Sequence, residues 1–237
     1  MNTTVAWITA RGLFGRRRFL LLFPLPVILV GLAAIARYAG VSAVQWATPV
    51  IEGLGLSVLI PITALIVGTG VLGSEIDDGT IVHILTKPLP RSQIILAKLA
   101  VAVGVTTVAV AVPLYLAGAL TGSVRLGLSL IVGAAVGSLV YTAIFLLLSL
   151  VTRRPVLLGL LYVLVWEGLL SNLVSGTRVL SVQQYTLSIT DAVARSELLT
   201  GRVSLTVALI MSAVLTVVST VLAIDRLRSF SVAGETS

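Results

Sequence analysis

Residues Gly73 to Lys98, GSEIDDGTIVHILTKPLPRSQIILAK, form the main polar interruption in an otherwise hydrophobic sequence. The stretch contains three acidic residues, two lysines, one arginine and the single histidine of the chain, His83. An apolar run ends near Leu72 and another begins at Ile94. These two runs, about residues 51–72 and 94–120, are long enough for membrane-spanning helices. We therefore predict that the polar stretch is a loop held at both ends by the membrane.

The interior of this loop is predicted to form a short helix. Ser74 can cap its start, and the acidic residues that follow suit the positive end of the helix dipole. Ile81, Val82 and Leu85 would then share one face. Pro88 ends the helix, because proline lacks the amide donor and pushes the preceding residue out of helical geometry. An ordinary solvated loop, whose charges keep it out of lipid, is the alternative.

The composition is that of an integral membrane protein. Hydrophobic residues make up 57% of the 237 residues and charged residues 11%, whereas soluble domains carry roughly 25% charged residues. The mean hydropathy is +1.13. The net charge of +7 does not indicate nucleic-acid binding, because the basic residues gather at the ends of apolar runs, where they act as topology signals. The chain has no cysteine, which excludes disulfides and thiolate metal sites.

Six apolar runs predict six membrane-spanning helices in an all-α fold. Their approximate bounds are 19–36, 51–72, 94–120, 126–151, 156–170 and 203–224. The first run follows an arginine triplet but is itself followed by further spans, so we interpret it as a retained helix rather than a signal peptide. Residues 1–228 are predicted to form one transmembrane domain, and 229–237 a disordered tail.

Segments outside the spans carry further expectations. The first fifteen residues are predicted to form an amphipathic helix at the lipid headgroups, with a disordered tail as the alternative. Tyr38 and Trp46, in the outer connection between the first two spans, are expected at the membrane interface. Residues 171–202 could cover the outer mouth or form two short re-entrant helices. Gly133 and Gly137 lie on one face of the fourth span, where we expect close helix packing within the chain rather than between subunits.

The basic residues predict which side of the membrane the loop faces. Six spans place both termini on one side, and the positive-inside rule makes the side richer in Lys and Arg cytoplasmic. With the termini inside, eleven of these residues are cytoplasmic and five are outside. The cytoplasmic set is Arg11, Arg16, Arg17, Arg18, Lys87, Arg91, Lys98, Arg153, Arg154, Arg226 and Arg228, and the outer set is Arg37, Arg125, Arg178, Arg195 and Arg202. A multi-pass protein of the cell membrane with a cytoplasmic 73–98 loop is the result.

The loop resembles that of a known family. It resembles the loop between the second and third spans of ABC transporter permeases of the type-2 export class. The residues that match this loop in order and spacing are Glu75, Gly79-Thr80, Leu85, Pro88, Arg91 and Lys98. It implies a coupling helix that docks on a separate cytoplasmic ATPase, which binds ATP and Mg²⁺. It also implies small outer-leaflet helices between the fifth and sixth spans, and pairing with a second permease copy or a paralogue. The predicted span layout resembles the family over the whole chain.

By this resemblance, the loop residues would have coupling roles. Glu75 would hold the loop in position, Gly79 would let the backbone pack closely, and Pro88 would fix the exit angle. The full set of candidate coupling residues is Glu75, Asp78, Gly79, Thr80, Ile81, Val82, Leu85, Pro88 and Arg91. Closure of the ATPases would tilt the second and third spans and open a path between two permease copies. The expected substrate is hydrophobic or amphipathic, such as a drug, a lipid or a peptide-like molecule.

The chain itself is not expected to be an enzyme or to hold a cofactor or metal. It has no glycine-rich phosphate loop followed by Lys and Ser or Thr, so ATP hydrolysis must come from another polypeptide. An intramembrane hydrolase is less favoured, because the serines within spans are far from His83, the one available base. One histidine also cannot supply the paired ligands of a metalloprotease.

Glu52 and Glu167 are the acidic residues that come closest to the middle of a predicted span, yet both map to outer ends. An ion-driven carrier or channel, the main alternative function, usually holds ionisable groups in the middle of its spans. We treat both carboxylates as candidates for the translocation path. For Glu167, which follows Trp166, an interfacial carboxylate that reaches water is the favoured interpretation.

Overall fold

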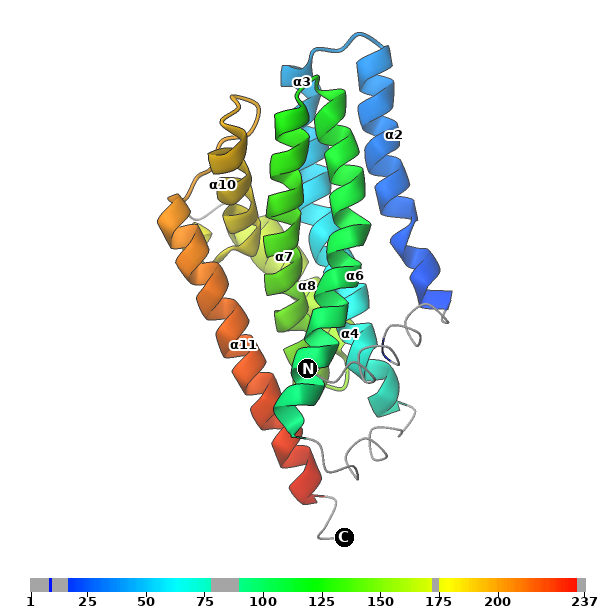
Figure 1. Ribbon diagram of the computed structural model, residues 1–237, viewed down its shortest axis with the longest axis vertical. Helices are drawn as coiled ribbons and strands as arrows, with labels where there is room; N and C mark the ends of the chain where they lie inside the picture. The colour runs from blue at the N-terminus through cyan, green and yellow to red at the C-terminus, as the bar shows by residue number, and fades with distance from the viewer. Residues whose placement is uncertain (1–8, 10–16, 78–89, 172–174, 234–237) are drawn as a thin grey trace.

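The computed structural model describes residues 9, 17–77, 90–171 and 175–233, and every regular element within these ranges is helical (Figure 1). The elements in chain order are η1 (Arg17–Leu22), α2 (Pro24–Tyr38), α3 (Ala43–Ala47), η2 (Thr48–Leu59), α4 (Ile60–Asp77), α6 (Arg91–Leu120), α7 (Val124–Val151), α8 (Pro155–Leu161), η3 (Tyr162–Leu170), η4 (Ser175–Leu180), α10 (Val182–Ala194) and α11 (Leu205–Ala233). Two of these, η2 and η3, are π-helices. The predicted amino-terminal helix, apart from Thr9, lies outside the described residues.

Five helices are long and apolar enough to cross a membrane. They are Leu20–Tyr38, Ala43–Gly73, Arg91–Leu120, Val124–Val151 and Leu205–Ser229. The remaining predicted span corresponds to a shorter apolar helix, Pro155–Leu170, made of α8 and η3. At 1.5 Å per residue this helix spans about 24 Å, less than the roughly 30 Å of a hydrocarbon core. The all-helical fold is confirmed, with five membrane-capable helices and one shorter apolar helix.

The second span begins earlier than the sequence predicts. α3 starts at Ala43 and passes directly into η2 and then α4. Pro49, which lies between the first two predicted spans, stands in the first two residues of η2 and thus inside this continuous helix. Trp46 is only 5% exposed and packs into the main core. Trp46 stands close to the start of the span Ala43–Gly73, so its expected place at the membrane interface stays a prediction.

α7 is the central helix and packs against α4, α6, α10 and α11. In Figure 1 it stands between α6 and α10, with α2 and α11 on the flanks. A Cβ atom at Gly118 would lie 2.7 Å from Cα of Gly127, so α6 and α7 are in close backbone contact near their connecting turn. A Cβ at Gly137 would lie 2.6 Å from Cγ2 of Thr186 in α10, and one at Gly133 would meet Thr190. The expected packing of these last two glycines within the chain is confirmed.

A second apolar core joins the ends of four helices. We call it the basal cluster, and its buried members come from α4, α6, α7 and α11: Leu72, Ile94, Ile95, Leu99, Ala143, Leu146, Leu150, Ala223 and Leu227. The main core lies elsewhere in the bundle and joins α2, η2, α4, α6, α7 and α10. The basal cluster therefore holds together the two helices that lead into and out of the 78–89 segment.

The described helix ends sort to two ends of the bundle. The end of α4 at Asp77, the start of α6 at Arg91 and the last turns of α11 lie at the lower end of Figure 1. The connections from α2 to α3, from α6 to α7 and from α10 to α11 lie at the upper end. η4 and α10 are two short elements before the last span, as one alternative for residues 171–202 predicts. α11 continues to Ala233, five residues into the predicted tail.

Candidate functional site

Most of the predicted coupling residues lie outside the described part of the chain. This applies to Asp78, Gly79, Thr80, Ile81, Val82, Leu85 and Pro88. Glu75 belongs to the last turn of α4, and Arg91 is the first residue of α6. The two flanking helix ends lie at the same end of the bundle (Figure 1). The structure therefore describes the base of the predicted coupling loop, and the coupling roles stay predictions.

The base of the loop is held by a buried lysine. Lys98 is 1% exposed, and its ammonium group donates a hydrogen bond of 3.0 Å to the main-chain carbonyl of Val71. This bond ties α6 to α4 about two turns from each end of the loop. A buried ammonium group is stable only with such partners. In the sequence, Lys98 is a topology signal and one of the residues that carry the family resemblance, and its contact with α4 is an addition made by the structure.

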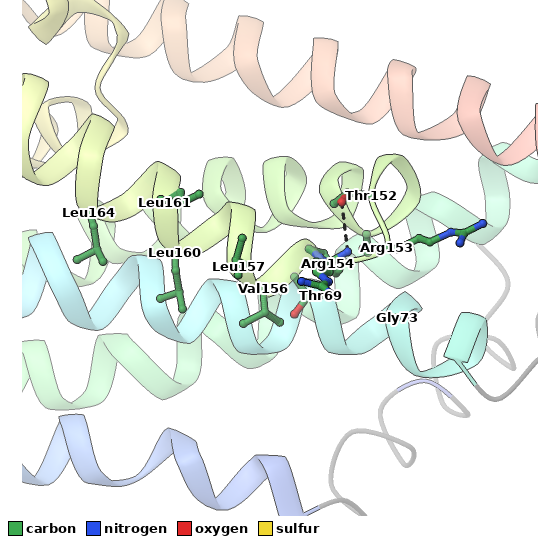
Figure 2. A pocket seen from close by; sticks show the side chains of 12 residues that line it. Thr69, Gly73, Thr152, Arg153, Arg154, Val156, Leu157, Leu160, Leu161 and Leu164 are labelled. Carbon is green, nitrogen blue, oxygen red and sulfur yellow. Dashed lines mark hydrogen bonds between the residues drawn. The ribbon is translucent and has the colours of Figure 1, made fainter.

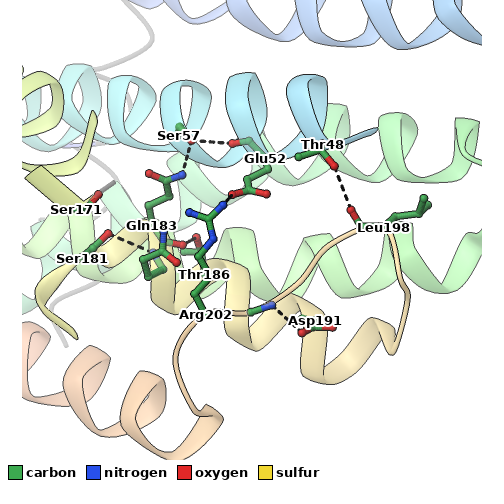
Figure 3. Close-up of polar contacts among 12 residues, drawn as sticks. Thr48, Glu52, Ser57, Ser171, Ser181, Gln183, Thr186, Asp191, Leu198 and Arg202 are labelled. Carbon is green, nitrogen blue, oxygen red and sulfur yellow. Dashed lines mark hydrogen bonds and ion pairs between the residues drawn. The ribbon is translucent and has the colours of Figure 1, made fainter. Parts of the chain in front are cut away.

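Glu52 lies on η2 near the upper end of the bundle and pairs with the segment before α11. Its Oε1 atom is 3.4 Å from a guanidinium nitrogen of Arg202. The two side chains are 13% and 40% exposed, so water weakens their attraction. Close by, the Thr48 hydroxyl donates to the carbonyl of Leu198 at 3.4 Å (Figure 3). These contacts fasten the connection between α10 and α11 to the start of η2.

Glu167 lies inside the protein, on η3, and is 1% exposed. Its Oε1 atom accepts hydrogen bonds from the Tyr162 hydroxyl and the Val182 amide, both at 2.9 Å. Its Oε2 atom accepts from the Ser181 hydroxyl at 2.5 Å and the Gln183 amide at 3.4 Å. The interpretation of Glu167 as a carboxylate that reaches water is therefore wrong. Four donors satisfy its two oxygens, as a buried carboxyl group requires.

The reason for this burial is the fold of the 171–202 region. Val182 and Gln183 are the first two residues of α10, and free amides at a helix start attract an anionic group. α10 packs on α7 with nearly all of its residues buried. Its amino-terminal end is thereby placed over η3, and the Glu167 side chain caps it. We call the set of Tyr162, Glu167, Ser181, Val182 and Gln183 the Glu167 clamp.

The clamp is linked to η2 by a side-chain bridge. The side-chain amide of Gln183 donates a hydrogen bond of 2.5 Å to the Ser57 hydroxyl. This hydroxyl itself donates to the main-chain carbonyl of Glu52 at 2.7 Å (Figure 3). The residues Glu52, Ser57, Gln183 and Glu167 are therefore linked by hydrogen bonds, in which Glu52 takes part through its main-chain carbonyl and Glu167 through its carboxylate. Each of them stands on a π-helix, a rare helix type that is frequent at functional sites.

Several residues of this network were not candidates in the sequence. Ser57 is one of the serines within the predicted spans, and the sequence alone assigns no role to Tyr162, Ser181 or Gln183. The available signal was the run Gln183-Gln184-Tyr185-Thr186, which is unusually polar for a buried helix. Burial and the nearby Glu167 carboxylate raise the pKa of Tyr185 above its ordinary value, so its phenol stays protonated.

Two serines of the fourth span form hydrogen bonds within their own helix. The Ser129 hydroxyl donates to the Leu126 carbonyl at 2.7 Å, and the Ser149 hydroxyl donates to the Leu146 carbonyl at 2.8 Å. Such local bonds are common for serine inside helices. Within the described ranges, no group of three or more His, Cys, Asp or Glu side chains could hold a metal ion.

A comparison with protein families finds a match, which covers both this network and the loop. A family model described as ABC-2 family transporter protein matches residues 16–183, well over half of the chain. The match includes the 73–98 loop, both π-helices and the start of α10. No curated protein matches the chain. Members of the matched family are the membrane-embedded permease components of ABC transporters and are generally non-catalytic. The chain, an all-helical multi-pass membrane protein, belongs to the ABC-2 transporter family.

Proposed function

We propose that this chain is the permease of an ATP-driven exporter and that a cytoplasmic ATPase subunit binds its 75–91 segment. The observation that carries the proposal is the rigid base beneath this segment. The Lys98–Val71 hydrogen bond and the basal cluster join α4 and α6 to each other and to α7 and α11. A force applied to the loop would therefore move the lower ends of four helices together. ATP and Mg²⁺ would be bound by the ATPase.

The proposed orientation has the loop in the cytoplasm. Arg91, the Arg153–Arg154 pair and the Arg226–Arg228 pair all stand on helix ends or turns at the lower end of the bundle. The positive-inside rule assigns such an end to the cytoplasm. An ATPase can reach the loop only from that side, so charge distribution and coupling role agree.

The exported substrate would be hydrophobic or amphipathic. α8 and η3 present a mostly apolar surface beside α4, with Leu157 and Leu164 more than half exposed. A path between this chain and a second copy or a paralogue would be lined in part by such side chains. A drug, a lipid or a peptide-like molecule fits this chemistry better than a sugar or an ion.

A direct test measures ATPase binding. Gly79→Trp is expected to abolish co-purification of the ATPase, because the bulky ring would stand where the proposed interface requires close backbone contact. Gly31→Trp is the matched control: no atom lies within 4 Å of a Cβ atom placed on Gly31 in α2, so the same change there should leave binding intact. Equal binding by both variants and the wild type would remove the coupling assignment.

The buried carboxylate favours one alternative, an ion-driven carrier. An acidic group inside the spanning region is the feature that such carriers use, and Glu167 is buried within the helical bundle. Its four donors instead favour a clamp between η3 and α10. Uptake into liposomes distinguishes the two functions, with the chain reconstituted either alone or together with the ATPase. Ion-gradient-driven uptake that is lost in Glu167→Gln would support the carrier, and uptake only with ATPase and ATP would support the exporter.

A further inference from the structure

A groove of about 860 Å³ runs between α4 and α8 and ends at the turn from α7 to α8 (Figure 2). One wall is formed by α4, at Thr69 and Gly73, and the other by α8 and the start of η3. The groove is separate from the Glu167 clamp, whose residues do not line it. Its two ends differ in chemistry, and this difference identifies the kind of molecule that it fits.

The long wall of the groove is apolar. Leu157, Leu160 and Leu164 follow one another at helical spacing along α8 and η3, and they are 52%, 37% and 66% exposed. This part of the chain lies in an apolar helix of the transmembrane domain. Large exposed apolar surfaces mark the binding of a partner or of hydrocarbon. A flexible hydrocarbon chain satisfies such a wall.

The mouth of the groove is basic. Arg153 and Arg154 belong to the turn between α7 and α8, and both line the groove. Figure 2 shows their guanidinium groups at the end from which the leucines lead away. Among the described residues neither guanidinium group has an acidic partner. Guanidinium groups bind phosphate oxygens with strong, charge-assisted hydrogen bonds, so this end favours an anionic headgroup.

The length of the groove matches one leaflet of a bilayer. Ten residues separate Arg154 from Leu164, a rise of about 15 Å at 1.5 Å per residue, and half of a hydrocarbon core is also about 15 Å. Basic pockets between membrane helices on the cytoplasmic side are known binding sites for anionic lipid headgroups. A second copy of this chain is a poorer occupant at the mouth, because a two-fold contact would bring the same arginines toward each other.

We propose that the groove between α4 and α8 binds one anionic phospholipid. Arg153 and Arg154 hold its phosphate, and an acyl chain lies along Leu157, Leu160 and Leu164. The bound lipid fills the space beside α8 and neutralises the charge of the turn. This inference depends on the membrane fold and not on the exporter function, so it can fail or hold independently of ATPase binding.

The test measures lipid retention by the full chain. Wild type and variants are placed in nanodiscs of phosphatidylglycerol and phosphatidylcholine with identical acyl chains, and lipids that remain bound are counted by native mass spectrometry. The wild-type protein should retain more phosphatidylglycerol than phosphatidylcholine. The double variant R153Q/R154Q should lower that preference roughly 30-fold, since each basic residue near an anionic surface contributes about a factor of five. R226Q/R228Q, which removes two charges from α11, should behave as wild type.

Two further variants change the apolar wall of the groove. Leu160→Trp fills the groove but keeps both arginines, and it should lose the retained lipid. The chain has no cysteine, so Leu164→Cys allows cross-linking to a second copy without background. Full retention of phosphatidylglycerol in R153Q/R154Q or in Leu160→Trp would overturn the proposal. The proposal would also be overturned if Leu164→Cys cross-linked completely to a second copy while the protein retained no phosphatidylglycerol, because a second chain would then occupy the groove. Should R153Q/R154Q not fold, Leu160→Trp and the single variant Arg154→Gln decide.

Discussion

The hydroxyl of Tyr162 donates a hydrogen bond of 2.9 Å to Oε1 of Glu167, five residues further along η3. Five residues is the hydrogen-bonding repeat of a π-helix, so both side chains project from the same side. In an α-helix the same two residues would stand about 140° apart around the axis. The π-helical form of η3 thus brings the phenol and the carboxylate together, and the start of α10 completes the clamp.

Removal of the buried carboxylate is expected to destabilise the protein strongly. Glu167→Leu leaves the Tyr162 and Ser181 hydroxyls and the Val182 amide without their acceptor. Each unsatisfied buried donor costs about 1–3 kcal/mol, so the free energy of unfolding should fall by at least about 3 kcal/mol. Denaturant unfolding in detergent measures the change. Glu52→Leu is the control, because its partly exposed ion pair is worth less than about 1 kcal/mol. Equal losses in both variants would contradict the clamp.

The bridge between α10 and η2 should behave as a coupled pair. Gln183 donates to Ser57 at 2.5 Å, and both belong to elements that are far apart in the sequence. In a double-mutant cycle with Gln183→Leu and Ser57→Ala, we expect a coupling energy of about 1 kcal/mol in unfolding free energy. Additive single effects would show that the bridge is not formed in the membrane-embedded protein.

Close packing at Gly137 predicts a large effect of a small change. Gly137→Ala places a Cβ atom 2.6 Å from Cγ2 of Thr186, so the Thr186 side chain or α10 itself must move away from α7. Overpacking of this kind typically costs about 1–3 kcal/mol. Gly31→Ala, in open space on α2, should be neutral or stabilising, because alanine favours a helix over glycine. Thermal unfolding of the two variants side by side measures the difference, and a stabilised Gly137→Ala would refute this packing.

Local sequence patterns predicted the helical fold and the glycine contacts. Long apolar runs suffice to place membrane helices, because the bilayer fixes their length. Gly133 and Gly137 form a flat face from spacing alone, and the structure places α10 there. The start of the second span was missed because Pro49 lowers local helix preference, whereas the helix continues through this residue from α3 into η2. Local patterns thus predict which segments are helical better than they predict where each helix begins.

The surroundings of Glu167 depend on two features that local patterns do not reveal. A 3.6-residue period does not predict that Tyr162 faces the carboxylate, since η3 is π-helical. The donors of Ser181 and Val182 arrive only because α10 packs back on α7. Beside Trp166, the carboxylate had the sequence signature of an interfacial residue, but tertiary packing buries it. The coupling residues at 78–88 stay predictions, since they lie outside the described residues.

The buried lysine at the base of the loop is expected to transmit force rather than to bind the ATPase. Lys98→Met keeps the length of the side chain but removes the hydrogen bond to the Val71 carbonyl. We predict normal co-purification of the ATPase together with transport reduced at least tenfold per ATP hydrolysed, a change equal to about 1.4 kcal/mol. Transport and ATPase assays in proteoliposomes measure both quantities. Loss of ATPase binding in Lys98→Met would place the residue in the interface instead.

The location of the 78–89 segment tests the central claim most directly. Because the chain has no cysteine, a single Thr80→Cys variant can be probed with a membrane-impermeant maleimide in intact cells. Ser42→Cys, at an exposed position in the connection from α2 to α3, serves as the opposite control. We predict that Cys at position 42 reacts in intact cells and that Cys at position 80 reacts only after the membrane is opened. Labelling of position 80 in intact cells would contradict a cytoplasmic ATPase acting on this loop.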